Sequence, residues 1–217
     1  MVLLDLDGTL SDSAPGILGS LRHAFAVNDI PPLDPQTERS LLGPPFYESL
    51  PPLLPDPAQL PAVVEAYRES YAAGGMYDTV VYDGVPEVLA AAATEGIRLA
   101  VATSKPEYFA VPIVERLGIA HYFETIGGDN LDGSLPTKAL VIDKVLTRLG
   151  RPTADTVRMV GDRRHDVLGA REHGIGCVGA GWGYGLPGEL AAAGAAPICA
   201  RPAELPAALG LPDRARH

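Results

Sequence analysis

Val-Leu-Leu-Asp-Leu-Asp-Gly-Thr-Leu, residues 2–10, is the stretch that decides the fold, because a short apolar run ends there at two aspartates. Three more short, continuous apolar runs follow, at Ile97–Ala102, Val157–Val160 and Ile175–Val178. The runs are too short for helices and do not alternate with polar residues, which is typical of strands covered on both faces in a parallel sheet. We therefore expect four buried parallel strands, the first at Val2–Leu4.

Helical patterns separate these strands. Pro106–Leu117 and Thr137–Leu149 carry apolar residues at spacings of three and four, and Arg164–His173 is a shorter helical candidate. Strands that alternate with helices predict an α/β fold with a doubly wound, Rossmann-like parallel sheet. The tail from Leu190 onward is rich in Ala and Pro, and we expect it to add a helix and a last edge strand.

The segment between Pro15 and Val81 departs from this rhythm, since it contains no convincing buried strand. Ala14–Val27 and Ala58–Ala73 have helical spacing, and ten prolines between positions 31 and 61 keep the remaining helices short. We predict an α/β core formed by residues 1–14 and 82–217, and a helical cap, residues 15–81, inserted after the first strand.

The composition limits the possible partners. The 217 residues carry a formal net charge of −10 and 47% of them are hydrophobic. The hydrophobic content supports a sizeable core, and the negative charge argues against nucleic acid or an anionic membrane as the main partner.

Cys177 and Cys199 lack metal-ligand spacing and are interpreted as buried thiols. Asp5 and Asp7 interrupt the first apolar run, so no signal peptide is expected, and no apolar stretch is long enough to cross a bilayer. The cytoplasm is the expected location, and both a monomer and a homodimer stay open.

Polar side chains follow three of the expected strands. Asp5, Thr103 and Asp162 each come directly after, or one residue after, an apolar run. In open α/β sheets, ligands bind at the carboxyl ends of the strands. We therefore expect these three side chains to face one crevice.

The first of these motifs places Asp5 and Asp7 two residues apart, where their charges repel each other. A cation relieves that repulsion, and carboxylate and carbonyl oxygens are the ligands that Mg²⁺ prefers. Gly8 permits a sharp turn after which its N–H and that of Thr9 could face a phosphate. The alternative is an acidic turn that caps a helix.

Two further segments suit an anionic ligand. Thr103 and Ser104 combine a strand-end hydroxyl with an expected helix start, although Ser104 could be only an N-cap. Lys138 lies in the first turn of an expected helix, where a cation opposes the helix dipole, so local stability does not explain it. A lysine that reaches into the crevice would offset phosphate charge, but the position taken alone favours a solvated surface lysine.

The last motif contains Asp162 and Asp166, four residues apart. If the segment is helical, the two carboxylates share a face and could bind one cation. The alternative is an acidic helix N-terminus, which the dipole favours in any case. His165 is interpreted as a surface residue or one that lies behind the ligands.

In this order, the motifs resemble those of the haloacid dehalogenase superfamily: Asp-x-Asp-Gly-Thr, a strand-end Thr, an isolated Lys and Gly-Asp-x-x-x-Asp. The resemblance covers essentially the whole chain, and the helical insert resembles that family's small helical cap, although relatives usually carry a few more residues before the first strand. The chain is most similar to phosphoglycolate phosphatases and 5′-nucleotidase-like members, through Asp12-Ser13-Ala14-Pro15-Gly16-Ile17, Gly43-Pro44-Pro45, Ala102-Thr103-Ser104-Lys105-Pro106, Gly161-Asp162-Arg163 with His165-Asp166, and Gly183-Tyr184-Gly185.

The resemblance implies a magnesium-dependent phosphatase that hydrolyses a small phosphate monoester through an aspartyl-phosphate. Asp5 is then the nucleophile, and Asp7 is the general acid and base. The resemblance also implies that Mg²⁺ is bound by the carboxylates of Asp5 and Asp162 and the carbonyl of Asp7, with Asp166 helping directly or through water. The phosphoryl group would be held by the side chains of Thr103 and Lys138 and by the N–H groups of Gly8, Thr9 and Ser104.

Other functions stay open. A phosphomutase of the β-phosphoglucomutase type would use the same motifs and a similar cap. A dehalogenase needs neither the acid Asp7 nor Mg²⁺. A non-catalytic, receiver-like phosphate-sensing module also has an acidic strand end, a Thr and a Lys, but the cap insert and Asp7 argue against it.

Candidate contacts between the cap and the leaving group are few, and each is equally explained as a surface or cap-core residue. They are Arg22, Arg39, Phe46 and Tyr47. The loop Trp182–Tyr184 is interpreted as packing.

Overall fold

The structure is a computed structural model that describes residues 1–44 and 46–211. Pro45, part of the Gly43-Pro44-Pro45 segment, therefore lies outside the described residues. The chain divides into two compact units. We call them the sheet unit, residues 1–11 with the described residues from 81 onward, and the helical unit, residues 12–80.

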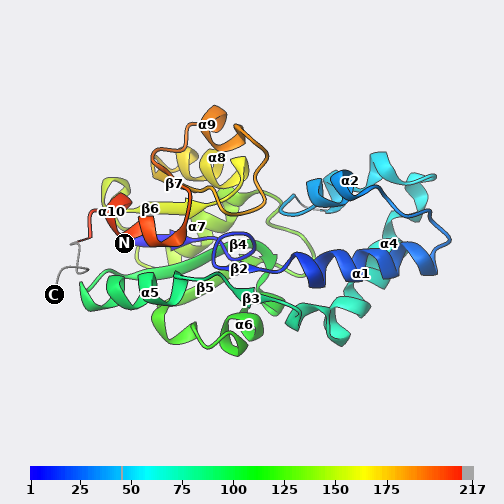
Figure 1. Cartoon of the computed structure of the whole chain (residues 1–217), viewed down its shortest axis with the longest axis horizontal. Coiled ribbons are helices and arrows are strands. Elements are labelled where there is room, and N and C mark those ends of the chain that lie inside the picture. Colours follow the sequence, from blue (N-terminus) through cyan, green and yellow to red (C-terminus); the bar gives the residue numbers. More distant parts are fainter. Residues whose placement is uncertain (45, 212–217) are drawn as a thin grey trace. The chain divides into compact units, whose positions relative to one another are not determined.

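The sheet unit is built on a six-stranded parallel sheet with strand order β5-β4-β1-β6-β7-β8 (Figure 1). The first strand lies in the interior of the sheet and pairs with β4 on one side and β6 on the other. This order confirms the doubly wound α/β fold. The strands are β1 Val2–Leu4, β4 Leu99–Pro106, β5 Thr125–Asp129, β6 Arg158–Gly161, β7 Gly176–Ala180 and β8 Ile198–Cys199.

Helices cover both faces of this sheet. In Figure 1, α8 and α9 are drawn on one side of the strands, and α5 and α6 on the other. Buried residues of α7 and α8 pack with strand residues such as Leu3, Ala100 and Met159 in one apolar cluster. The helices are α5 Val85–Thr94, α6 Glu107–Arg116, α7 Lys138–Arg148, α8 Arg164–Glu172, α9 Glu189–Ala193 and α10 Leu205–Ala208.

Some elements differ from the sequence-based expectation. Strand β5 was not expected, because Gly127 and Gly128 leave Ile126 as its one large apolar residue. Helix α5 was not expected either. Strand β4 continues through Thr103 to Pro106, so Ser104 is not the N-cap of a helix, and α6 begins at Glu107, one residue after the expected start at Pro106.

The helical unit has its own apolar core, in which residues of α1 and α4 such as Leu21, Phe25 and Val63 are buried together. Its boundaries fall at 11/12 and 80/81, beside the expected ones at 14/15 and 81/82. Two short strands, β2 Ser11–Asp12 and β3 Val80–Val81, pair at these boundaries. The helices are α1 Ala14–Val27, α2 Pro35–Ser40, α3 Phe46–Ser49 and α4 Leu60–Ala73.

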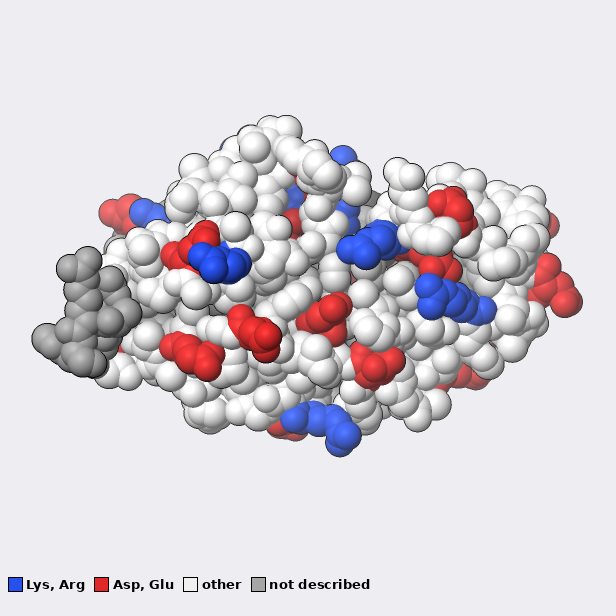
Figure 2. Space-filling model, in the orientation of Figure 1, with Lys and Arg blue, Asp and Glu red and all other residues white. Residues whose placement is uncertain are grey.

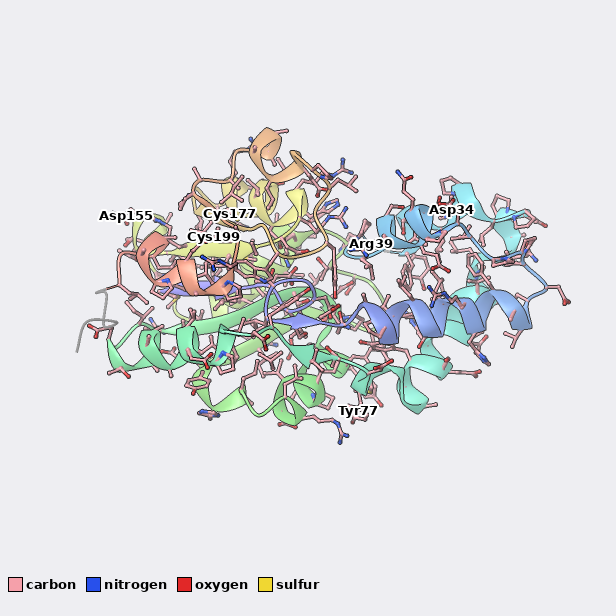
Figure 3. The ribbon with its side chains drawn as sticks, viewed as in Figure 1. Asp34, Arg39, Tyr77, Asp155, Cys177 and Cys199 are labelled. Carbon is pink, nitrogen blue, oxygen red and sulfur yellow. The ribbon has the colours of Figure 1, made fainter. Side chains whose placement is uncertain are left out.

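The exterior carries charges of both signs. On the face drawn in Figure 2, the coloured Asp and Glu side chains are spread out, and the Lys and Arg side chains do not gather into a patch. Within the described part of the chain, no helix combines the length and the apolar character that a bilayer span requires. Cys177 and Cys199, labelled in Figure 3, are both free and buried.

Candidate active site

Three carboxylates converge at the carboxyl edge of the sheet. Asp5 directly follows β1, Asp162 directly follows β6, and Asp166 lies in the first turn of α8. Each offers an oxygen, and these oxygens lie within 4.8 Å of one another, with all three residues buried. Asp162 precedes the helix, so it does not share a helical face with Asp166 as expected; the strand end brings the two together instead.

A buried lysine lies against this cluster. Lys138 is the first residue of α7, after the N-cap Thr137, whose side chain accepts the Leu140 N–H. Its Nζ atom is 2.8 Å from Asp5 Oδ1, from Asp166 Oδ1 and from the Ala102 carbonyl oxygen. Lys138 is 5% exposed, so the surface-lysine alternative does not hold.

Burial and like charges shape the acidity of the cluster. Burial raises the pKa of Asp5 to about 7, against the opposing attraction of Lys138. Burial, with the charges of Asp166 and Asp5, raises the pKa of Asp162 well above its usual value. Burial alone would lower the pKa of Lys138, but Asp166 and Asp5 raise it above its usual value. Two carboxylates with raised pKa values that cluster with a third, all of them hard oxygen ligands, fit a site for Mg²⁺.

The loop after Asp5 closes tightly over Asp162. Gly8 has φ +81°, and a side chain there would collide with Asp162 Oδ2, so both the backbone conformation and the space require glycine. Its N–H donates to the Ser11 carbonyl at 2.8 Å, and the Thr9 N–H donates to the Leu6 carbonyl at 3.3 Å. The expectation that these two N–H groups face a phosphate is therefore not met, because the turn itself uses them.

A second loop, after β7, completes the surroundings of Asp162. The Tyr184 N–H donates to Asp162 Oδ2 at 2.7 Å, while the Thr9 hydroxyl donates to Asp162 Oδ1 at 3.1 Å. The indole N–H of Trp182 donates to the Thr9 carbonyl at 3.1 Å. The interpretation of Trp182–Tyr184 as packing alone is thus incomplete, since this loop holds a carboxylate of the site.

Strand β4 contributes the neighbouring side of the site. Thr103 is 1% exposed, and its hydroxyl accepts the Lys105 N–H at 3.2 Å. Ser104 lies in the extended strand, so its N–H is not at a helix terminus. Lys105 was not among the expected site residues, yet its Nζ is 3.0 Å from Asp7 Oδ2, with both side chains largely buried.

Asp7 stands apart from the three clustered carboxylates. Its Oδ2 pairs with Lys105, and within the described structure its buried Oδ1 has no hydrogen-bond partner. The edge of the sheet thus holds two ion-paired groups, Asp5 and Asp166 with Lys138, and Asp7 with Lys105. Such a pair of differently placed aspartates is suited to nucleophilic attack by one and proton transfer by the other.

The comparisons with known proteins agree with this arrangement. The profile of the haloacid dehalogenase-like hydrolase family matches residues 2–180. The chain belongs to this family.

Relatives within the family carry different names. The chain is 44% identical over 185 residues to the tyrosine-protein kinase PtkA of Mycobacterium tuberculosis, covering 85% of this chain but only 63% of PtkA. The solved structure of PtkA superimposes with a TM-score of 0.76, covering 85% of each chain. A 5′-nucleotidase of Pseudomonas aeruginosa is 38% identical over 192 residues, 88% of this chain and 86% of the relative. A phosphoglycolate phosphatase of Pseudomonas fluorescens is 32% identical over 201 residues, 85% and 70% of the two chains.

The expected leaving-group contacts lie in the helical unit. Arg22 forms a two-pronged ion pair with the buried Glu38, and Phe46 packs edge-on against Tyr67 with ring centroids 4.6 Å apart. Both are therefore engaged within the unit. Arg39, labelled on α2 in Figure 3, is exposed, and Tyr47 is 51% exposed.

Proposed function

We propose that this member of the family is a magnesium-dependent phosphatase that hydrolyses a small phosphate monoester through a phosphorylated Asp5. The observation that carries the proposal is the position of Asp5, whose carboxylate lies at a strand end, 2.8 Å from Lys138 Nζ and clustered with the carboxylates of Asp162 and Asp166. A buried carboxylate in contact with a lysine and a cation-binding cluster suits attack on the phosphorus of a phosphoryl group, because the lysine and a bound cation would neutralise the negative charge on the phosphoryl oxygens.

Each residue then has a role in two steps. A carboxylate oxygen of Asp5 forms a bond to phosphorus as the bond to the ester oxygen breaks, and Asp7 gives its proton to the departing oxygen. Asp7 then takes a proton from water as the water oxygen attacks phosphorus and releases Asp5. Lys138 and Thr103 hold the phosphoryl oxygens. Mg²⁺, bound by Asp5, Asp162 and Asp166 and the Asp7 carbonyl, would supply positive charge for those oxygens.

The substrate class that we propose is a small soluble phosphate ester, either phosphoglycolate-like or a nucleoside 5′-monophosphate. The names of two relatives support these classes. A cytoplasmic location, as a monomer or homodimer, is part of the same proposal.

One relative supports a second candidate. PtkA is named a tyrosine kinase, and it is 44% identical to this chain over the matched residues. A phosphorylated Asp5 could pass its phosphoryl group to a tyrosine hydroxyl in place of water. Incubation with radiolabelled ATP and Mg²⁺ tests this, since label in protein tyrosine would support the kinase and its absence would favour hydrolysis. A phosphomutase is the third possibility, and it would be recognised by transfer of the phosphoryl group to a second sugar hydroxyl.

The test of the main proposal is phosphate release from a panel of metabolite monophosphates with Mg²⁺. Asp5→Asn should abolish release, because an amide oxygen is too poor a nucleophile to form the intermediate. Asp143→Asn, which alters a half-buried aspartate of α7 that pairs with Arg151, is the matched control and should retain activity. Chelation should remove activity and Mg²⁺ should restore it. Near-normal turnover by Asp5→Asn, or full activity in excess chelator, would show that the mechanism is wrong.

A further inference from the structure

The site contains two buried lysines in different settings. Lys138 Nζ lies 2.8 Å from three oxygens of the protein, two of which belong to the proposed nucleophile and to a metal-binding carboxylate. It therefore serves the phosphoryl group and the cation site. Lys105 Nζ lies instead 3.0 Å from Asp7 Oδ2, the group that we propose protonates the leaving oxygen. Nothing in the proposed phosphoryl transfer uses Lys105.

The backbone holds Lys105 firmly at this place. Strand β4 changes its register against β5 between Thr103 and Pro106, an irregularity of the kind that redirects side chains beside active sites. Gly128 of β5 packs so closely that a side chain there would collide with the Lys105 carbonyl. The Lys105 N–H is bound to the Thr103 hydroxyl. The side chain is 6% exposed, so the ammonium group is committed to the site and not to solvent.

Stability does not explain this placement. Removing an ammonium and a carboxylate from water costs several kcal/mol each, and a buried pair often recovers no more than that. The Asp7 partner also keeps a second buried oxygen, Oδ1, without a hydrogen-bond partner among the described residues. An incompletely satisfied polar pair at a ligand-binding edge indicates that a ligand completes it.

The charge at the site indicates the kind of ligand that completes this pair. Asp5, Asp162 and Asp166 cluster at this edge of the sheet, and Asp7 pairs with Lys105, so a negatively charged leaving group needs a cation of its own there. Asp7 must be within about 3 Å of the ester oxygen to give it a proton. Because Lys105 Nζ is 3.0 Å from Asp7, its ammonium group is within reach of a substituent one or two bonds beyond that oxygen.

We propose that Lys105 binds a carboxylate of the leaving group, so that the preferred substrates are short phosphate esters with a carboxylate on the carbon that bears the ester oxygen. This inference rests on the proposed phosphatase function and deepens it. A nucleoside leaving group has no charge at that place, so Lys105 favours the phosphoglycolate-like class over nucleoside monophosphates. Its three N–H donors allow contact with Asp7 and with the substrate carboxylate together.

The test compares two esters that differ only in this group. The kcat/KM values for 2-phosphoglycolate and for ethyl phosphate are measured for the wild type, for Lys105→Met and for Lys144→Met. Lys144 is a matched control, because it is a partly buried lysine of the same unit that pairs with Glu107. We expect the wild type to prefer the carboxylate ester, and Lys105→Met to lower the ratio of the two values roughly tenfold or more, the usual effect of losing a hydrogen bond between charged groups. Lys144→Met should keep the wild-type ratio.

The outcomes separate the two proposals. If the wild type releases phosphate from neither ester nor from the metabolite panel, the phosphatase function itself fails. If the wild type is active but Lys105→Met lowers kcat/KM equally for both esters, Lys105 only orients Asp7 and the recognition role is wrong. A wild-type enzyme without preference for the carboxylate ester would overturn it as well. Circular dichroism and the melting temperature of Lys105→Met show whether the variant is folded.

Discussion

At the scale of single residues, the site brings buried charges of both signs together, and burying them costs free energy. Asp5 is held beside Lys138, which favours its ionised form, but burial and the neighbouring Asp166 and Asp7 oppose ionisation more strongly. A bound cation would reverse this balance, because its charge favours all the ionised carboxylates around it. The free energy of unfolding of the metal-free protein should therefore depend on pH in a way that reports on Asp5.

The direction of this pH dependence follows from the raised pKa of Asp5. Asp5 has a pKa of about 7 when folded and 3.8 as a reference value, so between these values the unfolded chain releases a proton that the folded chain keeps. The stabilising contribution is complete below the lower pKa and is lost as the pH rises through the upper one. Asn cannot titrate. In excess chelator, the melting temperature of the wild type minus that of Asp5→Asn should therefore fall from about pH 5 to about pH 8. Saturating Mg²⁺ should reduce this fall, and a difference that stays constant or rises in chelator would contradict the assignment.

The sequence reveals some of these residues and conceals others. Asp5, Lys138, Asp162 and Asp166 can be predicted because each follows a strand or lies in the first turn of a helix, and parallel topology brings such places to one edge. Lys105 could not be predicted in the same way. Its direction depends on a register shift and on the close approach of a neighbouring strand, which are properties of tertiary packing.

At the scale of elements, the segment from β7 to α9 acts as a support for Asp162. Glu189, the first residue of α9, is 9% exposed in its side chain; it accepts the Arg163 Nε at 2.9 Å, the Arg164 N–H at 2.8 Å and the Leu186 N–H at 3.0 Å. Burial alone would raise the pKa of Glu189, but these hydrogen bonds hold it below its usual value. The loop fixed in this way donates the Tyr184 N–H to Asp162.

Glu189→Gln should weaken Mg²⁺ binding while leaving the proposed ligands in place. The Gln amide carries no charge, and its NH₂ group would face N–H groups that now donate to Glu189. The loop should therefore loosen, and Asp162 should be oriented less firmly. Loss of such a supporting contact typically costs roughly tenfold or more in metal affinity. Trp182, the single tryptophan of the chain, lies in this loop and donates to Thr9, so its fluorescence can follow a magnesium titration without any substrate.

The control for this experiment is Glu204→Gln. Glu204 also accepts a backbone N–H, from Ala200 at 2.8 Å, but it contacts neither the loop nor the clustered aspartates in the hydrogen bonds and ion pairs of the described residues. The Glu204→Gln variant should bind Mg²⁺ with the affinity of the wild type. Equal affinities for wild type and a folded Glu189→Gln would show that the loop does not support the metal site. The sequence alone conceals this role, because a glycine-rich loop followed by a glutamate looks like an ordinary helix start.

At the scale of the whole molecule, the chain leaves the sheet unit at 11/12 and returns to it at 80/81. Periodicity and the absence of buried strands were enough to predict this helical insertion, because both are local properties of the sequence. The surroundings of its single side chains depend instead on packing within the unit, which is not a local property of the sequence. Arg22 and Phe46 are engaged inside the helical unit, whereas Arg39 and Tyr47 are exposed.

We expect phosphoryl transfer to depend on the sheet unit and recognition of the leaving group to depend on the helical unit. We propose that the helical unit is a lid connected through β2 and β3, in keeping with lids that close over a reaction. Arg39→Ala and Tyr47→Ala should then change the order in which phosphate esters are preferred, because exposed side chains of a lid act on the leaving group. Lys138→Ala should lower kcat/KM for all esters together, roughly a hundredfold or more, because a charge contact to the phosphoryl group is lost in every case. Glu65→Ala, which alters an exposed residue of α4, is the control and should keep the wild-type order. Measuring kcat/KM on several esters, including p-nitrophenyl phosphate, decides the matter: a uniform loss from both lid variants, or an ester-selective loss from Lys138→Ala, would contradict this division of roles.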